Sequence, residues 1–336
     1  MKKILPWLAA AAGAAWAGTK FSRWRQTRMA ELQQNGTVVE TAVGPIEYAM
    51  QGSGPVLLIS HGGPGGYDQI TMMADLVDAG FCVLAPSRPG YLGTPLSAGV
   101  TVAEQADAMI ALLDSLGIEQ VAAVGVSAGG PIALELALRY PDRLWSLVML
   151  SAVALPYQPN EETADSALGK LFLSDGLVWL LDIGTWLFEQ FSLHFPLASA
   201  KMMLQTESDL PPEQIKKHLD YMQQNPERVA WYKALIRSTG PMSVRKAGLD
   251  NDLVQLAAVS RRSLEGITAP TLVMHGQHDA DVTYNNAQSV AERVDQAQLV
   301  TLPNAGHLIW LSPEWPNAHN QLITFLNQDS ISPETV

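Results

Sequence analysis

Cysteine is almost absent from this chain of 336 residues. The single cysteine, Cys82, lies inside an apolar run and is interpreted as a small buried hydrophobic residue. One cysteine cannot form a disulfide within the chain, so the cysteine count does not fix the cellular compartment. The sequence also contains no internal repeat and no low-complexity tract beyond an alanine-rich N-terminus.

Basic residues are outnumbered by acidic ones. The chain has 21 Lys and Arg against 33 Asp and Glu, a net charge of −12. Proteins that bind nucleic acid need basic patches, so this balance argues against a nucleic-acid partner. Charged residues make up 16% of the chain and hydrophobic residues 47%, as in a globular protein on the apolar side. No feature of the sequence predicts an oligomeric state.

The N-terminus carries an apolar run that is shorter than a usual membrane span. Ile4–Gly18 would extend about 22 Å as a helix, against a hydrocarbon core of about 30 Å. The run is followed by four cations, Lys20, Arg23, Arg25 and Arg28. Because positive charge tends to stay cytoplasmic, we interpret residues 1–30 as a single N-terminal membrane anchor, which predicts a membrane localisation. A signal peptide cleaved near Ala15-Trp16-Ala17 before export, or a soluble surface helix, are the alternatives.

From Gly36 onward, short runs of strand type alternate with helical patterns. Thr37–Ala42 and Ile46–Gln51 are joined by Gly44-Pro45, which predicts a hairpin. Alternation of buried strands with helices predicts an α/β fold, with a mostly parallel sheet and helices on both faces. The other predicted strands are Pro55–Ser60, Phe81–Pro86, Val121–Val124, Leu147–Ser151, Thr271–Met274 and Gln298–Leu302.

The alternation is interrupted by a stretch that shows only helical patterns. These are Leu168–Leu187, Pro212–Gln224, Arg228–Ser238 and Leu253–Ser263. We therefore predict a core in two parts, residues 36–151 and 266–328, with a helical cap of residues 152–265 inserted after the sixth strand. Ligands bind at the carboxyl edge of open α/β sheets, so the cap is expected to cover that edge.

The strongest local signal lies between the strand Val121–Val124 and a following helix. Small residues flank a serine in Gly125-Val126-Ser127-Ala128-Gly129-Gly130. A strand that turns sharply into a helix strains the backbone at the serine and needs glycines where side chains would collide. The turn projects the hydroxyl group in front of a helix N-terminus, which favours developing negative charge. Ser127 is therefore predicted to be a nucleophile.

Two later strands end in residues that complete such a site. Asp279 follows the strand Thr271–Met274, and His307 follows Gln298–Leu302, so both fall on the sheet edge that carries Ser127. The chain order is nucleophile, acid, base. In that arrangement the imidazole takes the serine proton, and the carboxylate fixes the imidazole tautomer and stabilises the imidazolium.

From about residue 36 to 328 the sequence resembles the α/β-hydrolase superfamily, in members that carry a helical cap. Four motifs carry the resemblance in the expected order, HGGPGG, GVSAGG, HGQHD and AGH. The resemblance implies a catalytic triad of Ser127, Asp279 and His307, with an oxyanion hole made by the amides of Gly63 and Ala128. It also favours Asp279 over Asp281, because the acid of this superfamily commonly lies three residues after the glycine that ends its strand.

These motifs predict a serine hydrolase that cleaves an ester with an apolar acyl or alcohol group through an acyl-Ser127 intermediate. An aminopeptidase or a C–C bond hydrolase uses the same triad, and a non-catalytic membrane-tethered receptor or scaffold would keep the fold. The HGGPGG motif resembles that of prolyl aminopeptidases, but those carry tryptophan after the serine, where this chain has Ala128. Superfamily members that attack with aspartate are disfavoured because the residue at 127 is serine.

No cofactor is predicted. His275, His278, Asp279 and Asp281 resemble a metal cluster, but no cysteine or further histidine is spaced to close a coordination shell, so no metal is predicted. Asp175, Asp182 and Glu189 recur at a spacing of seven, which places them near one face of a helix. We expect that face to be solvated, and therefore expect a small-molecule substrate that is apolar and uncharged near the scissile bond.

Overall fold

An eight-stranded sheet forms the centre of the protein, in a computed structural model that describes residues 5–157, 178–259 and 263–329. The strand order is β1-β2-β4-β3-β5-β6-β7-β8. β2 pairs antiparallel with β1 and β4, and every other pairing is parallel, which confirms the predicted α/β fold. The strands are β1 Thr37–Thr41, β2 Gly44–Gln51, β3 Val56–Ser60, β4 Cys82–Pro86, β5 Val121–Val126, β6 Leu144–Leu150, β7 Thr271–Gly276 and β8 Gln298–Leu302.

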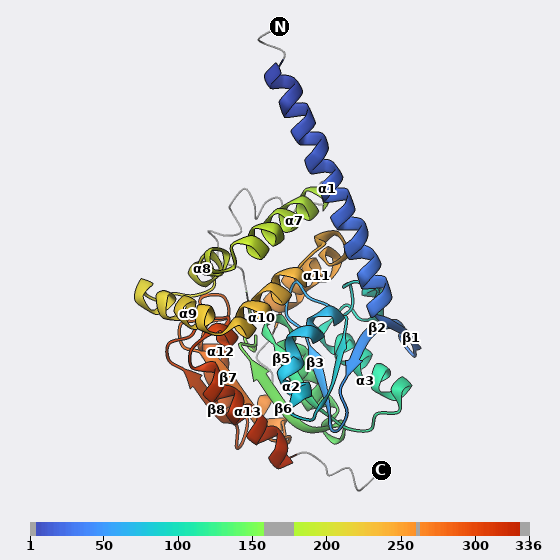
Figure 1. Ribbon diagram of the computed structural model, residues 1–336. Coiled ribbons are helices and arrows are strands. Elements are labelled where there is room, and N and C mark those ends of the chain that lie inside the picture. The colour runs from blue at the N-terminus through green and yellow to red at the C-terminus, as the bar shows by residue number, and fades with distance from the viewer. Residues whose placement is uncertain (1–4, 158–177, 260–262, 330–336) are drawn as a thin grey trace.

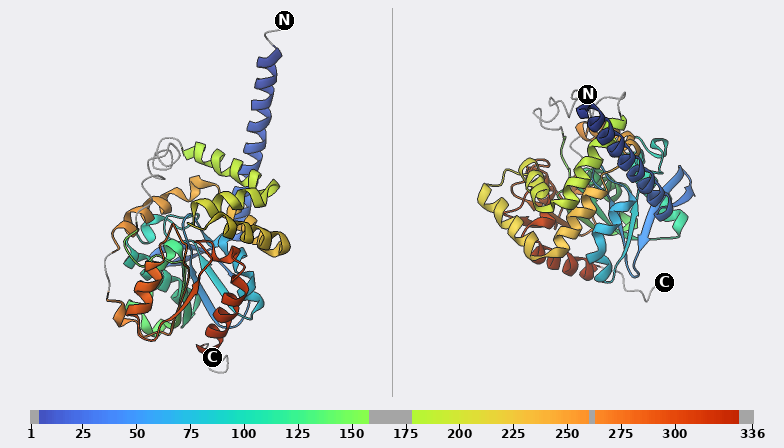
Figure 2. Two further views of the ribbon diagram at one scale, coloured as in Figure 1. Left: turned by 90° about the vertical axis from the view of Figure 1, so that its left-hand side faces the viewer. Right: turned by 45° about the horizontal axis from the view of Figure 1, so that its top comes forward.

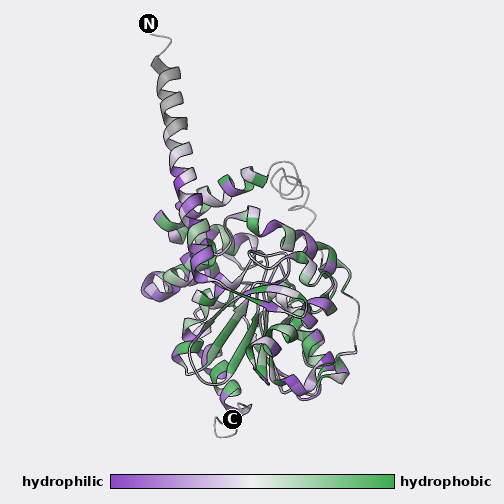
Figure 3. Cartoon of the chain, turned by 90° about the vertical axis from the view of Figure 1, so that its right-hand side faces the viewer, coloured by the Kyte–Doolittle hydropathy of each residue, from purple (hydrophilic) through white to green (hydrophobic). Residues whose placement is uncertain are grey.

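Helices cover both faces of this sheet, because the central strands are apolar on both sides. Along β3, Leu57 and Ile59 belong to one hydrophobic core and Leu58 to the other. The first core includes α2 and α13, and the second includes α3, α4 and α12. Figure 3 shows the strands as the hydrophobic interior. These helices are α2 Ala74–Asp78, α3 Val102–Leu116, α4 Gly130–Arg139, α12 Asn285–Arg293 and α13 Trp315–Asp329.

In the described part of the segment between β6 and β7, five further α-helices lie over one end of the sheet (Figures 1 and 2). They are α7 Val178–His194, α8 Pro196–Thr206, α9 Pro212–Gln224, α10 Pro226–Arg237 and α11 Lys246–Ala257. The expected helices 212–224 and 228–238 correspond to α9 and α10. The sequence patterns missed α8 and placed the start of α11 too late, and residues 168–177 of the first expected helix lie outside the described residues. The predicted domain boundaries stay a prediction.

The N-terminal helix corrects the predicted localisation. α1 (Leu5–Asn35) is long, yet no described helix combines the length and the apolar character that a membrane span needs. The single N-terminal anchor and the membrane association inferred from it are therefore wrong. The physical reason is that the apolar run is short, is built largely from alanine, glycine and tryptophan, and continues into the cations of the same helix.

The second half of α1 is bound to the rest of the protein, whereas its N-terminal part extends away from it (Figure 1). Leu32 is buried, and the Tyr67 hydroxyl donates to the Leu32 carbonyl. Three side chains of α1 hydrogen-bond to acids outside the helix: Trp24 to Glu189, Arg25 to Asp182, and Arg28 to Asp68. The folded unit therefore begins within α1.

The same contacts correct the expectation of a solvated acidic face on α7. Asp182 and Glu189 are both buried, and each binds a side chain of α1. Asp182 also accepts hydrogen bonds from the amide and the hydroxyl of Ser243. Asp175 lies outside the described residues. The spacing of seven does place Asp182 and Glu189 on one face, but that face meets a helix and not water.

We expect truncations of α1 to show that its second half stabilises the protein and that its N-terminal part does not. Deleting residues 1–35 removes Arg28 from Asp68, which keeps Arg245, and takes the α1 partners from the buried acids Asp182 and Glu189, so we expect a total cost of about 3 kcal/mol. For a chain of this size that lowers the melting temperature by roughly 4 °C. Deleting residues 1–15 keeps every α1 contact named above and should leave the melting temperature unchanged. Calorimetry of the two truncations makes the comparison. Equal melting temperatures would contradict the inference that the second half of α1 stabilises the protein.

Candidate active site

The turn after β5 places Ser127 in a strained backbone conformation. Its φ is 49°, in the left-handed region that non-glycine residues rarely adopt. The turn is possible because Gly129 lies directly against β3, where a Cβ would be 1.9 Å from the Ser60 carbonyl oxygen. At the next residue, a Cβ on Gly130 would be 2.3 Å from the Val153 carbonyl oxygen. The predicted need for glycine in this motif therefore has a steric cause.

Ser127, His307 and Asp279 form a continuous hydrogen-bonded chain. The Ser127 Oγ lies 3.1 Å from Nε2 of His307, and Nδ1 of His307 lies 2.8 Å from Oδ2 of Asp279. The other oxygen of Asp279 accepts the amides of Asp281 and Val282. A carboxylate at Nδ1 fixes the proton there and leaves the Nε2 lone pair facing the serine. The sequence predicted these three residues, and the structure brings them together.

The charges around His307 favour its protonated form. Burial alone would lower the pKa of the imidazole, but Asp279, Asp281 and Glu207 outweigh it and raise that pKa to about 10. Burial would raise the pKa of Asp279, but the imidazoles of His307 and His275 lower it overall. Asp279 therefore stays ionised beside an imidazole that readily accepts a proton.

The loop after β3 lies against the serine. A Cβ built on Gly62 would be 3.0 Å from the Ser127 Cβ, and Gly63 lines the same cavity as Ser127. Ala128 follows the serine and is buried. These placements bring both predicted oxyanion residues, Gly63 and Ala128, next to Ser127. Their role in binding an oxyanion stays a prediction.

His61 holds the shape of that loop. Its Nδ1 lies 2.7 Å from the Gly62 carbonyl oxygen, and its Nε2 accepts the amide of Arg88. Burial, reinforced by the Arg88 charge, lowers the pKa of His61 well below its usual value. His61 is therefore a neutral structural residue whose two nitrogens are both engaged within the protein.

A buried ion pair ties this loop to the inserted helices. Arg88 after β4 binds Asp252 of α11 through two hydrogen bonds, of 2.7 and 2.5 Å, and donates a third to the His61 carbonyl. The Tyr91 hydroxyl also donates to Asp252. Sequence analysis missed this pair. The only available signal was a cation and an aromatic residue in the loop Ser87–Thr94, with nothing to point to Asp252.

Ser127 and His307 open into a cavity of about 310 Å³. Most of its lining is apolar and comes from the sheet loops and from α8 and α10. Among the described lining residues there is no lysine or arginine, and the ionisable groups besides His307 are Glu207, Asp281 and Tyr157. The apolar side chains are Met72, Met73, Val126, Met203, Trp231, Leu235, Ile236, Leu308 and Trp310.

Glu207 is a pocket residue that sequence analysis missed. It follows α8, and its carbonyl accepts the amides of His307 and Ala280. Burial, reinforced by the charges of Asp281 and Asp279, raises the pKa of its carboxyl group to about 7. The inserted helices therefore do turn one acid towards the reacting centre, although not one of the acids on α7.

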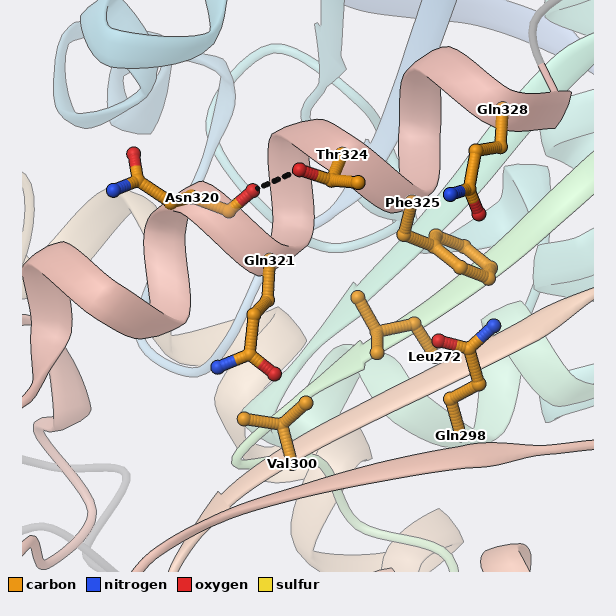
Figure 4. Close-up of a pocket in the computed structure, with 8 residues that line it drawn as sticks. All are labelled: Leu272, Gln298, Val300, Asn320, Gln321, Thr324, Phe325 and Gln328. Atoms are coloured by element: carbon orange, nitrogen blue, oxygen red, sulfur yellow. Dashed lines mark hydrogen bonds between the residues drawn. The ribbon is translucent and has the colours of Figure 1, made fainter.

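A second hollow of about 220 Å³, drawn in Figure 4, lies between α13 and the strands β7 and β8. None of its lining residues is ionisable, and the one hydrogen bond drawn, from the Thr324 hydroxyl to the Asn320 carbonyl, is an ordinary contact within a helix. It does not include Ser127 or His307. This hollow therefore offers no ionisable side chain for catalysis.

Comparison with known proteins identifies the family. A family defined by the α/β hydrolase fold matches residues 55–312. The uncharacterized hydrolase YcgS of Bacillus subtilis is 32% identical over 289 residues, which are 84% of this chain and 95% of that protein. A 2-hydroxy-6-oxo-6-phenylhexa-2,4-dienoate hydrolase of Comamonas testosteroni is 26% identical over 296 residues, or 84% of this chain and 91% of that protein.

Among solved structures, an α/β hydrolase fold protein from Nakamurella multipartita superposes with a TM-score of 0.79 at 32% identity, covering 87% of this chain and 98% of the other. These matches confirm the resemblance inferred from the motifs. This chain is therefore an enzyme of the α/β-hydrolase family.

Proposed function

We propose that this enzyme hydrolyses a carboxylic ester with an apolar acyl or alcohol group through an acyl intermediate on Ser127. The observation that carries the proposal is the hydrogen-bonded chain from Ser127 through His307 to Asp279, which ends at the apolar cavity. A serine in that setting is activated by the neighbouring base, and the cavity supplies room for an apolar group of moderate size.

The reaction follows from the positions of the three side chains. The Ser127 oxygen attacks the ester carbonyl carbon while Nε2 of His307 takes the hydroxyl proton. The amides of Gly63 and Ala128 stabilise the negative oxygen of the tetrahedral intermediate. The carbon–oxygen bond to the alcohol then breaks, and the imidazolium gives its proton to the leaving alcohol. Water, deprotonated by the same imidazole, attacks the acyl carbon. The bond from that carbon to the Ser127 oxygen then breaks, the imidazolium returns its proton to this oxygen, and the acid leaves.

Pocket charge argues against the C–C bond alternative. The relative from Comamonas testosteroni is named for a dienoate, which is a carboxylate. The pocket of this chain presents Glu207 and Asp281, and its described lining contains no lysine or arginine to pair with an anion. A substrate carboxylate would meet like charge there, so a neutral ester fits this pocket better.

An aminoacyl substrate is the second candidate, and Glu207 is the observation that favours it. A carboxylate turned into the pocket is suited to bind the free amine of an aminopeptidase substrate. The residue after the nucleophile, Ala128, argues the other way, because prolyl aminopeptidases resembling this chain in the HGGPGG motif carry tryptophan there. The apolar lining as a whole leads us to place the ester first.

Replacing the nucleophile should abolish turnover. Ser127→Ala removes the attacking oxygen and should lower kcat for a p-nitrophenyl ester by at least about 10⁴-fold. A fluorophosphonate probe should label the wild-type protein and leave the variant unlabelled. Ser115→Ala, at an exposed serine of α3, is the matched control and should behave as the wild type. Normal hydrolysis by a folded Ser127→Ala protein would refute the nucleophile.

Replacing the acid should misorient the base. Asp279→Asn keeps the shape of the side chain but presents an amide to Nδ1, which favours the wrong tautomer, so kcat should fall by up to about 10⁴-fold. Asp281→Asn, two residues along the same loop, should lose far less. Steady-state kinetics of the two variants provide the test, and the reverse order of losses would reject Asp279 as the acid.

Substrate class is decided by a paired assay. We expect a medium-chain p-nitrophenyl ester to exceed proline p-nitroanilide in kcat/KM under the same conditions, because the cavity is mainly apolar. Should the anilide be the better substrate, Glu207→Gln ought to abolish that preference while the ester activity remains. That pair of results would replace the ester proposal with an aminopeptidase.

A further inference from the structure

His307 has a second carboxylate neighbour that the triad does not use. Asp281 lines the cavity, and its Oδ2 lies 3.7 Å from Nε2 of His307. Asp279 is on the opposite side of the ring, at Nδ1. The imidazole therefore has one carboxylate beside each nitrogen, and Asp281 shares the side on which Ser127 lies.

The position of Asp281 is fixed from two directions. Its amide donates to Oδ1 of Asp279, which holds the backbone of the loop. Its own Oδ1 accepts the hydroxyl of Tyr157 at 2.6 Å, so the other oxygen is left on the side of His307. The Tyr157 amide in turn donates to the Leu256 carbonyl of α11. Burial, together with the charge of Asp281, raises the pKa of Tyr157, so its hydroxyl stays a donor.

We propose that Asp281, oriented by Tyr157, is a positioning residue for the base, a second carboxylate that stabilises the His307 imidazolium formed when Ser127 gives up its proton. The inference rests on the proposed function, because it needs His307 to act as that base. No bond to carbon is made or broken by Asp281. It acts only through its charge and its fixed distance from Nε2.

The distance and exposure of Asp281 suit this role better than that of the triad acid. At 3.7 Å it is too far from Nε2 for a hydrogen bond, so it does not fix the tautomer. Its side chain is 32% exposed, whereas that of Asp279 is fully buried, so solvent screens part of its charge. An opposite charge within about 4 to 6 Å still favours the protonated imidazole.

The full set of groups facing the ring determines the sign of the effect. Asp279 and Asp281 face it from the loop after β7, Glu207 from the end of α8, and Ser127 from the turn after β5. All three acids raise the pKa of His307, against the lowering by burial. The reaction needs the neutral imidazole, so kcat/KM rises with pH as His307 loses its proton. Removing one acid lowers that pKa and moves the rise to lower pH.

A purely structural role makes a different prediction. If the bond between Tyr157 and Asp281 only tied the segment after β6 to the loop after β7, its loss would lower stability and leave the pH profile in place. The pH dependence of kcat/KM therefore separates the two roles, and the melting temperature alone does not.

The experiment measures kcat/KM for p-nitrophenyl butyrate from about pH 7 to about pH 12, with spontaneous hydrolysis subtracted, so that both sides of the His307 pKa of about 10 are covered. For Asp281→Asn, the acid limb should move about one unit to lower pH, and the plateau should change by less than about tenfold. Tyr157→Phe frees Asp281 from its anchor and should move the limb in the same direction by less. Asp209→Asn is the control, because this exposed acid pairs with His278 and not with His307.

A limb that stays in place or moves to higher pH in Asp281→Asn would overturn the proposal. If that variant fails to fold, the limb of Tyr157→Phe decides in the same way. Failure of the proposed function looks different, because the wild type would then neither hydrolyse the ester nor react with the fluorophosphonate at Ser127.

Discussion

The contact between Gly129 and the carbonyl of Ser60 is the constraint on which the site depends. It brings the end of β3 and the turn after β5 so close that no side chain fits between them. The same approach brings Gly62 against Ser127 and forces the serine into its positive φ. Strain of this kind persists only where the surrounding structure over-determines it, and here two buried parallel strands do so. The same close contact therefore positions both Ser127 and the loop that carries Gly63.

Buried ion pairs then connect the loop after β3 to the inserted helices and to α1. Arg88 and Asp252 join it to α11, while Asp68 binds both Arg245 and Arg28 of α1. Arg245 also donates to the Gly65 carbonyl. Taking such charges out of water costs several kcal/mol for each ion, so the pairs add little net stability, yet losing one partner is expensive. We therefore expect them to favour this one arrangement of the loop, the inserted helices and α1 over arrangements that would leave a charge unpaired.

The parts of this structure that could be predicted from sequence are those with local signals. Strands buried on both faces show continuous apolar runs, and Ser127, Asp279 and His307 each follow such a run. Glu207, Tyr157 and Arg88 carry no such signal, because each matters through a partner far away in sequence. The acids of α7 show the limit most clearly. A spacing of seven places Asp182 and Glu189 on one face, but only the fold reveals that α1 covers that face.

The apolar run at the N-terminus failed as a predictor for a related reason. Hydrophobicity summed over a short run cannot distinguish a helix that crosses a membrane from one whose following turns bind the protein, since both need apolar and cationic residues in sequence. From the sequence alone, Trp24, Arg25 and Arg28 are compatible both with a membrane helix and with a helix that binds the rest of the protein. The difference lies in their partners, Asp68, Asp182 and Glu189. The sequence patterns place the last two in solvent and give Asp68 no role.

The acidic residues around the pocket, finally, affect His307 in two opposing ways. Carboxylates around His307 make the imidazole a stronger proton acceptor, but they also keep more of it protonated at neutral pH, when it cannot act. The two loop acids contribute unequally to this balance. Asp279 is buried, hydrogen-bonded and at the nitrogen that defines the tautomer, so its charge cannot be removed without losing the geometry. Asp281 and Glu207 face the cavity, where a bound substrate would displace water and change their environment. If His307 acts as the proposed base, we therefore expect its strength to depend both on a fixed acid and on acids that the substrate itself can influence.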